Sequence, residues 1–167
     1  MILVGIGSNL AAPGSESPLQ TAEAALACLP DIGARVVQCS RWYESAPVPV
    51  SDQPWFINGV CEVASDCDPP ALLAALLTLE AKFGRRRSVA NAARTLDLDL
   101  LDYDGRRHQT AQLTLPHPRL HERRFVLAPL ADIAPGWRHP LFGATAAELL
   151  ARLRGQPIRA LPWDGEA

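Results

Sequence analysis

The segment 95–103 alternates between apolar and acidic side chains, and this pattern constrains the fold more than any other in the chain. Leucines stand at 96, 98 and 100, while Asp97 and Asp99 occupy the positions between them. Successive residues of a strand point to opposite faces, so the alternation predicts a strand with one buried leucine face. The two carboxylates then project side by side from the other face, roughly 7 Å apart along the strand.

The segments around this strand supply the rest of an α+β fold. Apolar patterning predicts strands over 1–7, 35–44 and 55–65, and helices over 17–29 and 69–83. With the 95–103 strand, the order is that of the ferredoxin-like βαββαβ plan, an antiparallel sheet with helices on one face. Asp104-Gly105 predicts a hairpin turn and a C-terminal hairpin strand over 106–115, followed by appended helices over 124–134 and 145–154.

Length and composition indicate a single domain over 1–167, whose segment 142–167 carries no diagnostic motif. No apolar run approaches the roughly 18 residues of a membrane span. The first residues lack the basic region of a secretory signal, so we expect a cytoplasmic protein with no membrane partner. The net charge of −2 argues against a nucleic-acid partner, and four cysteines without a paired spacing predict reduced thiols.

The paired aspartates follow a basic segment. Two neighbouring carboxylates repel each other unless a cation satisfies them, and Mg²⁺ accepts one or two carboxylates together with substrate phosphates. Arginines at 85, 86, 87 and 94 precede the pair, and guanidinium groups bind phosphate oxygens in bidentate fashion. The sequence therefore favours a phosphate-handling site. The alternative interpretation is a surface strand whose acidic face is exposed to solvent, beside a solvated basic loop.

A second set of residues suits a flat ring. Phe56 and Asn58 share one face of the 55–65 strand, where an aromatic plate beside an amide could bind a heterocycle. Phe125 could supply a second plate. The alternative is that both phenylalanines are core residues and the amide is satisfied within the protein. His117, between two prolines, favours a hydrogen bond to phosphate or a carbonyl over a zinc site.

These segments together resemble the 6-hydroxymethyl-7,8-dihydropterin pyrophosphokinase family of folate biosynthesis. The motifs that carry the resemblance occur in the family's order: GIGSNL at 5–10, SxxY…P…DQPxFxN from 40 to 58, ExxxGR at 80–85, RTLDLD at 94–99, LPHP at 115–118 and RRFVLAPL at 123–130. They cover most of residues 2–142. The chain departs from the family pattern at 90–93, at Gln112 and at Pro118.

The resemblance implies a ferredoxin-like fold and transfer of diphosphate from MgATP to the pterin hydroxymethyl group, with release of AMP. It implies two Mg²⁺ ions held by Asp97 and Asp99. The catalytic set would be Arg85, Arg94, Asp97 and Asp99. The pterin-binding set would be Ser45, Ala46, Val48, Phe56, Asn58 and Phe125. The ATP-binding set would be Glu80, Arg87, Thr114, His117 and Arg123.

Two other functions fit the same residues. A ferredoxin-like binding module without catalysis would use the arginine segment to grip RNA or an acidic partner. A metal-dependent phosphohydrolase would release phosphate without any pterin. We expect the pyrophosphokinase, with ATP and 6-hydroxymethyl-7,8-dihydropterin as its small-molecule partners, and we expect a monomer.

Overall fold

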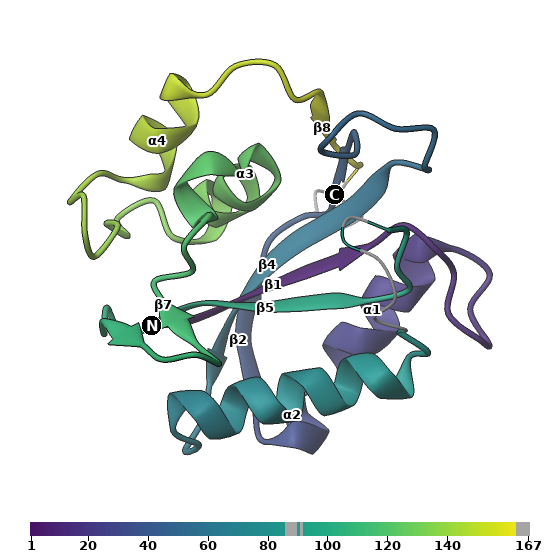
Figure 1. Cartoon of the computed structure of the whole chain (residues 1–167), viewed down its shortest axis with the longest axis horizontal. Helices are drawn as coiled ribbons and strands as arrows, with labels where there is room; N and C mark the ends of the chain where they lie inside the picture. Colours follow the sequence, from purple (N-terminus) through teal and green to yellow (C-terminus); the bar gives the residue numbers. More distant parts are fainter. Residues whose placement is uncertain (86–89, 91, 163–167) are drawn as a thin grey trace.

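A computed structural model describes residues 1–85, 90 and 92–162 of the chain. Within this range, six strands form one antiparallel sheet (Figure 1). Strand β1 (Ile2–Ser8) lies between β5 (Asp97–Tyr103) and β4 (Phe56–Ala64). Beyond β4 lie β2 (Arg35–Cys39) and β3 (Tyr43–Ser45), and β3 pairs in turn with β8 (Ile158–Ala160).

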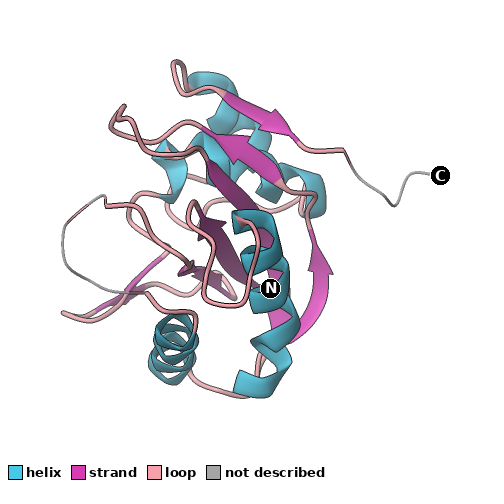
Figure 2. Cartoon of the chain, turned by 90° about the vertical axis from the view of Figure 1, so that its right-hand side faces the viewer, coloured by secondary structure: helices cyan, strands magenta, loops and turns pink. Residues whose placement is uncertain are grey.

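Helices cover both faces of this sheet, as the view in Figure 2 also shows. Helices α1 (Pro18–Cys28) and α2 (Pro69–Lys82) pack against the face that carries Val4, Leu98 and Leu100. Helices α3 (Arg124–Ile133) and α4 (Ala146–Arg152) share the opposite core with Leu3, Val60 and Leu101. The described chain therefore has three layers, with the antiparallel sheet between two layers of helices.

Local signals explain where the main helices begin. Ser17 caps α1 by accepting a hydrogen bond from the backbone N–H of Gln20, and Asp68 caps α2 in the same way. Proline follows each cap, at a position where its missing N–H costs nothing. Thr145 and Glu148 form a reciprocal capping box at α4.

The α+β class and the main elements are confirmed, with four differences. The segment expected to form one strand over 35–44 is split into β2 and β3, both of which pair with β4. The predicted C-terminal hairpin strand over 106–115 is wrong as a partner of β5. That segment instead forms a separate ribbon of β6 (His108–Gln109) and β7 (Thr114–Leu115), joined to β5 through the left-handed turn at Asp104 and Gly105.

The other two differences concern the appended part of the chain. The helices appended after β7 cover the second face of the sheet, because Leu101 and Val60 present an apolar surface there that must be buried. The segment 142–167, in which no motif was recognised, contains β8. Short 3₁₀ helices at Leu29–Ile32 and Leu120–Glu122 complete the elements of the described residues.

Two further expectations can be compared with the structure. None of the described helices is long and apolar enough to cross a membrane. All four cysteines lie in the described ranges and are free thiols.

Substitution of Gly59 tests how tightly β4 packs against Trp42. A Cβ at this position of β4 would lie 2.7 Å from Cζ3 of Trp42, which real Cβ atoms do not tolerate. We expect Gly59→Ala to destabilise the fold by roughly 1–3 kcal/mol, and thermal unfolding should show a melting temperature lower by roughly 5 °C.

Gly136→Ala is the matched control, because no atom lies within 4 Å of a Cβ built there. This control should melt close to the wild type. Equal melting temperatures for the Gly59 and Gly136 variants would contradict the packing described for β4.

Candidate functional site

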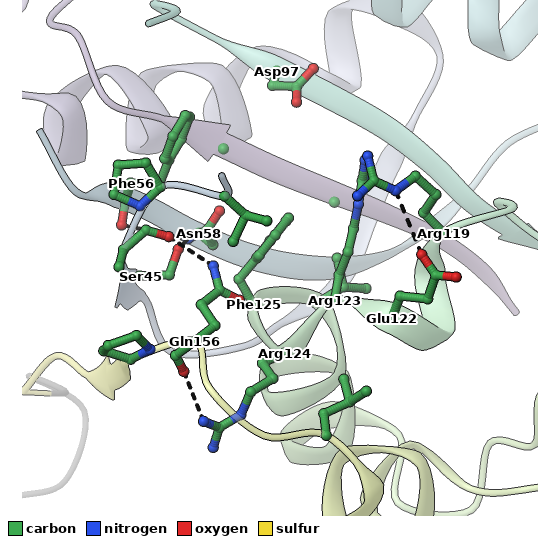
Figure 3. A pocket seen from close by; sticks show the side chains of 18 of the residues that line it. Ser45, Phe56, Asn58, Asp97, Arg119, Glu122, Arg123, Arg124, Phe125 and Gln156 are labelled. Atoms are coloured by element: carbon green, nitrogen blue, oxygen red, sulfur yellow. Dashed lines mark hydrogen bonds and ion pairs between the residues drawn. The ribbon is translucent and has the colours of Figure 1, made fainter. Parts of the chain in front are cut away.

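A pocket of about 540 Å³ opens on the sheet face that α3 leaves uncovered, beside the N-terminal half of β5 (Figure 3). Asp97 and Asp99 point into it, whereas Leu101, further along the same face, packs under α3. The pocket is also lined by the 45–50 segment, by parts of β1 and β4, by 119 and 122–126, and by the C-terminal segment 153–157. Pieces of the chain that are far apart in sequence therefore meet here.

The floor of the pocket is made by glycines of β1. Gly7 pairs with Asn58 on one side and with Asp97 on the other. A Cβ at Gly7 would lie 3.4 Å from Oδ1 of Asn58 and 3.8 Å from Cβ of Asp97. A larger side chain there would fill the space between the amide and the carboxylate.

The carboxylate end of the pocket is held by arginines. Arg85 donates from Nη1 to Oδ1 of Asp97 at 2.6 Å, and Arg94 donates to Oδ2 of the same residue at 2.9 Å. Arg123 donates to Oδ2 of Asp99 at 3.0 Å. Guanidinium groups thus surround both carboxylates from three separate segments of the chain.

Glu80 anchors this arrangement from the neighbouring helix. Its side chain is buried near the C-terminal end of α2 and accepts the backbone N–H of Leu98 at 2.8 Å. It also forms an ion pair with Arg85. Because a buried carboxylate needs such partners, Glu80 fixes the position of Arg85 relative to β5.

Burial and mutual repulsion govern the charge of the aspartate pair. Burial, followed by the charge of Asp97, raises the pKa of Asp99 to about 6, even though the charge of Arg123 acts in the opposite direction. A bound cation would relieve this repulsion, so the pair has the electrostatic character of a metal site.

His117 is neutral at physiological pH. Burial, followed by the charge of Arg123, lowers its pKa to about 4. Its Nδ1 accepts the backbone N–H of Arg119 at 3.1 Å, which leaves the proton on Nε2. That Nε2 lies 3.9 Å from Oδ1 of Asp99, so His117 presents an N–H donor beside the carboxylates.

The opposite end of the pocket combines aromatic rings with a buried amide. Asn58 is 4% exposed and donates from Nδ2 to Oγ of Ser45 at 2.7 Å. Phe56 and Phe125 are partly buried and line the same end of the pocket, and the guanidinium of Arg123 lies 5.5 Å from the centre of the Phe125 ring. Figure 3 shows Ser45 and Asn58 close together at this end, with Asp97 farther along the pocket.

The carboxylates of the pocket suit Mg²⁺, which needs few protein ligands, better than a metal that is coordinated by protein side chains alone. Among the described residues, no group of three or more His, Cys, Asp or Glu side chains could hold an ion. Two carboxylates meet the requirement of Mg²⁺, which keeps several waters and completes its coordination with substrate phosphates. Asp97 and Asp99 are therefore the residues that fit the ion.

Most of the residues predicted from sequence lie at this pocket. Those that line it are Ser45, Ala46, Val48, Phe56, Asn58, Arg94, Asp97, Asp99, Arg123 and Phe125. Arg85 contacts Asp97, Glu80 pairs with Arg85, and His117 is near Asp99. Thr114 is exposed on β7 and is not among the lining residues, and Arg87 falls in the part of the chain that the structure leaves undescribed.

The pocket also contains residues that sequence reasoning missed. Arg119, Glu122 and Arg124 line it, as does the segment 153–157 that follows α4. Arg124 stands next to a recognised position, so the motif at 123–130 could have indicated it. The 153–157 segment carries no comparable signal, because it reaches the pocket only through the pairing of β8 with β3.

The pocket has the two ends that a transferase needs to join a phosphate-bearing substrate to a ring-bearing one. The sequence profile of 7,8-dihydro-6-hydroxymethylpterin-pyrophosphokinase (HPPK) matches residues 3–135. The chain therefore belongs to the 7,8-dihydro-6-hydroxymethylpterin-pyrophosphokinase family.

Individual relatives agree with this assignment. A 2-amino-4-hydroxy-6-hydroxymethyldihydropteridine pyrophosphokinase of Synechocystis is 43% identical over 90% of this chain and 75% of its own length. The protein of the same name from Pseudomonas aeruginosa is 40% identical over 96% of both chains. The folic acid synthesis protein fol1 of Schizosaccharomyces pombe is 38% identical over 76% of this chain, which spans only 17% of that longer protein.

Solved structures show the same fold. A Plasmodium falciparum HPPK-DHPS triple mutant superposes with a TM-score of 0.71 over 90% of this chain, at 13% identity. The chain spans 42% of that protein, so it corresponds to less than half of it. At this identity the likeness concerns the fold.

The raised pKa of Asp99 leads to a prediction about stability. The folded chain holds a proton on this residue up to about pH 6, whereas an unfolded aspartate releases it near its ordinary value of 3.8. The ionised group therefore destabilises the folded state above pH 6, and this cost disappears as the pH falls. In metal-free buffer at pH 8, we expect Asp99→Asn to raise the melting temperature by roughly 2–4 °C.

The pH dependence distinguishes this effect from a general one. At pH 5 the difference between Asp99→Asn and the wild type should shrink, because the wild-type carboxyl is then largely protonated. Asp66→Asn, at an exposed position before α2, is the control and should change little at either pH. A melting temperature for Asp99→Asn below that of the wild type at pH 8 would contradict the charge balance described here.

Proposed function

We propose that this protein transfers diphosphate from MgATP to the hydroxymethyl group of 6-hydroxymethyl-7,8-dihydropterin and releases AMP, as a step of folate biosynthesis. Membership in the pyrophosphokinase family supports the reaction. The observation that carries the proposal is that one pocket contains both the arginine-bound carboxylate pair and a buried amide together with two phenylalanines.

The ring end of the pocket binds the pterin in this proposal. Asn58 offers a donor and an acceptor to the polar edge of the ring, and Ser45 orients its amide. Phe56 and Phe125 stack on the two faces of the ring. Further hydrogen bonds come from the backbone of Val48 and from the second lone pair of the Ala46 carbonyl, since the Ala46 N–H is already paired with Pro157.

The arginine end binds the phosphates of ATP. Arg85, Arg94 and Arg123 already point at this part of the pocket, and each can exchange a carboxylate oxygen for a phosphate oxygen as ATP enters. The neutral His117 donates from Nε2 to a phosphate oxygen without adding charge. Glu80 contributes indirectly, because it holds Arg85 in place.

Asp97 and Asp99 would hold two Mg²⁺ ions, which supply neutralisation of the phosphate charge when bound. The pterin hydroxymethyl oxygen attacks the β-phosphorus and forms a new P–O bond. The bond from that phosphorus to the oxygen shared with the α-phosphate breaks, and AMP leaves with this oxygen. The hydroxyl proton passes to solvent. The protein contributes mainly alignment of the two substrates and arginine charge on the transferred group.

Several finer expectations form part of the same proposal. The strand order β5-β1-β4-β2, with α1 and α2 on one face, supports a ferredoxin-like plan for the core of a single domain over 1–167. The ATP contacts of Thr114 and Arg87 stay predictions. A monomeric state, a cytoplasmic location and the absence of nucleic-acid or membrane partners also stay predictions.

Measurement of AMP separates this function from its alternatives. The protein is incubated with MgATP, with and without 6-hydroxymethyl-7,8-dihydropterin. A pyrophosphokinase releases AMP only when the pterin is present. A phosphohydrolase releases phosphate in both samples, and a binding module without catalysis releases neither product.

The aspartate pair is the first target for substitution. We expect Asp97→Ala and Asp99→Ala each to lower kcat by a factor of about 10³, because the metal-binding charge is lost. Circular dichroism should show that each variant is folded. Asp66→Ala is the control and should keep wild-type turnover. Near-normal AMP release by Asp97→Ala would contradict a metal role for this residue.

Substitution of Asn58 tests pterin binding separately from ATP binding. Replacement by alanine removes the amide that reads the polar edge of the ring, which should raise KM for the pterin about tenfold or more. KM for ATP should stay within about twofold of the wild type, since the phosphates bind at the other end. Steady-state kinetics with each substrate varied in turn measures both constants. An equal rise in both would mean that Asn58 serves the whole pocket rather than the pterin.

A further inference from the structure

The C-terminal segment 153–157 forms one wall of the pocket at its ring end. It follows α4 and turns at Gly155, whose φ of 99° lies in the left-handed region that favours glycine. Figure 3 shows Gln156 of this segment reaching toward Ser45 and Asn58, the residues proposed above to read the pterin. The segment is thus placed beside substrate-binding residues.

Backbone pairing fixes the segment in this position. The backbone N–H of Ala46 donates to the carbonyl of Pro157 at 3.1 Å. Strand β8 then continues antiparallel to β3, with Ile158 opposite Ser45. The wall is therefore an extension of the sheet edge.

Gln156 makes the contacts that reach into the pocket. Its side-chain Nε2 donates to the carbonyl oxygen of Ala46 at 2.8 Å. Its backbone carbonyl accepts a hydrogen bond from Nη1 of Arg124 at 2.7 Å, which ties the segment to the start of α3. Gln156 is partly buried, so these bonds form away from bulk solvent.

These contacts connect Gln156 to the side-chain amide of Asn58, which is proposed to bind the pterin. Gln156 donates a hydrogen bond to the carbonyl of Ala46, the residue that follows Ser45 in the chain. Oγ of Ser45 in turn accepts a hydrogen bond from the side-chain amide of Asn58. Rotation of the Ala46–Pro47 peptide would break the first bond and loosen the backbone that follows Ser45. A hydrogen bond that restrains a binding group in its bound orientation improves affinity by reducing the cost of ordering it.

We propose that Gln156 is a positioning residue for the site of the ring-bearing substrate. It holds Ala46 and, through it, Ser45 in the orientation that binds this substrate. This inference rests on the proposed pterin function. The residue acts on pterin binding and leaves the phosphate end of the pocket unaffected. Its effect should therefore appear in KM for the pterin, with little change in kcat or in KM for ATP.

The test uses the full-length protein and two substitutions. Gln156→Ala removes the side chain, and Gln156→Glu keeps its size but removes the N–H donor and sets a carboxylate against the Ala46 carbonyl. We expect each to raise KM for the pterin about tenfold. The dissociation constant of the pterin, measured by titration calorimetry, should rise by the same factor. KM for ATP and kcat should stay within about twofold of the wild type.

Arg159→Ala is the matched control on the same segment of chain. Arg159 is exposed on β8 and pairs with Glu44, outside the pocket, so its loss perturbs the tail without touching Ala46. This variant should keep wild-type KM for both substrates. Thermal unfolding of all three variants shows whether each is folded, and Gln156→Glu keeps the test available if the alanine variant unfolds.

Three results would overturn the inference while leaving the proposed function intact, provided that the wild type releases AMP with the pterin. The first is a pterin KM within twofold of the wild type in the Gln156 variants. The second is an equal rise in KM for ATP. The third is the same change in Arg159→Ala, which would make the effect one of tail docking. Absence of pterin-dependent AMP release by the wild type would overturn the function itself.

Discussion

The antiparallel pairing of β1 between β4 and β5 is the constraint on which the rest of the site depends. The register places Asn58 and Asp97 on either side of Gly7, so the ring end and the phosphate end of the pocket are set by backbone hydrogen bonds. A shift of one residue in either pairing would turn one of these side chains to the opposite face. The leucines of β5 prevent such a shift, because the same slip would expose them to solvent.

The site also carries an electrostatic cost that the fold tolerates. Two carboxylates on neighbouring positions of one strand face repel each other, and burial adds to the penalty on Asp99. Arginines from three segments offset this cost, and Glu80 in turn neutralises Arg85. The same positive charges suit the phosphates of a nucleotide. Groups that stabilise the protein without substrate are thus also the groups that can bind the substrate.

Much of the fold and of the site could be predicted from the sequence because the patterns involved are local. The alternation around Asp97 and Asp99 gave the strand and the face of both carboxylates, and period-2 patterning placed Phe56 and Asn58 on one face of β4. The family motifs added residues such as Arg123 and Phe125, whose meeting at one pocket no local pattern indicates. The ribbon of β6 and β7 was mistaken for a partner of β5, because a turn signal shows that the chain reverses without showing what it pairs with next.

The sequence by itself determined the main strands and helices, the aspartate pair and the family, since periodicity, capping residues and motif spacing are properties of short stretches of chain. Only the tertiary structure decided that α3 and α4 cover the second face of the sheet and that Gln156 lies against Ala46. Gln156 and Ala46, for example, are more than a hundred positions apart in the sequence. Such contacts depend on which surfaces remain to be buried once the sheet has formed, and no short segment carries that information.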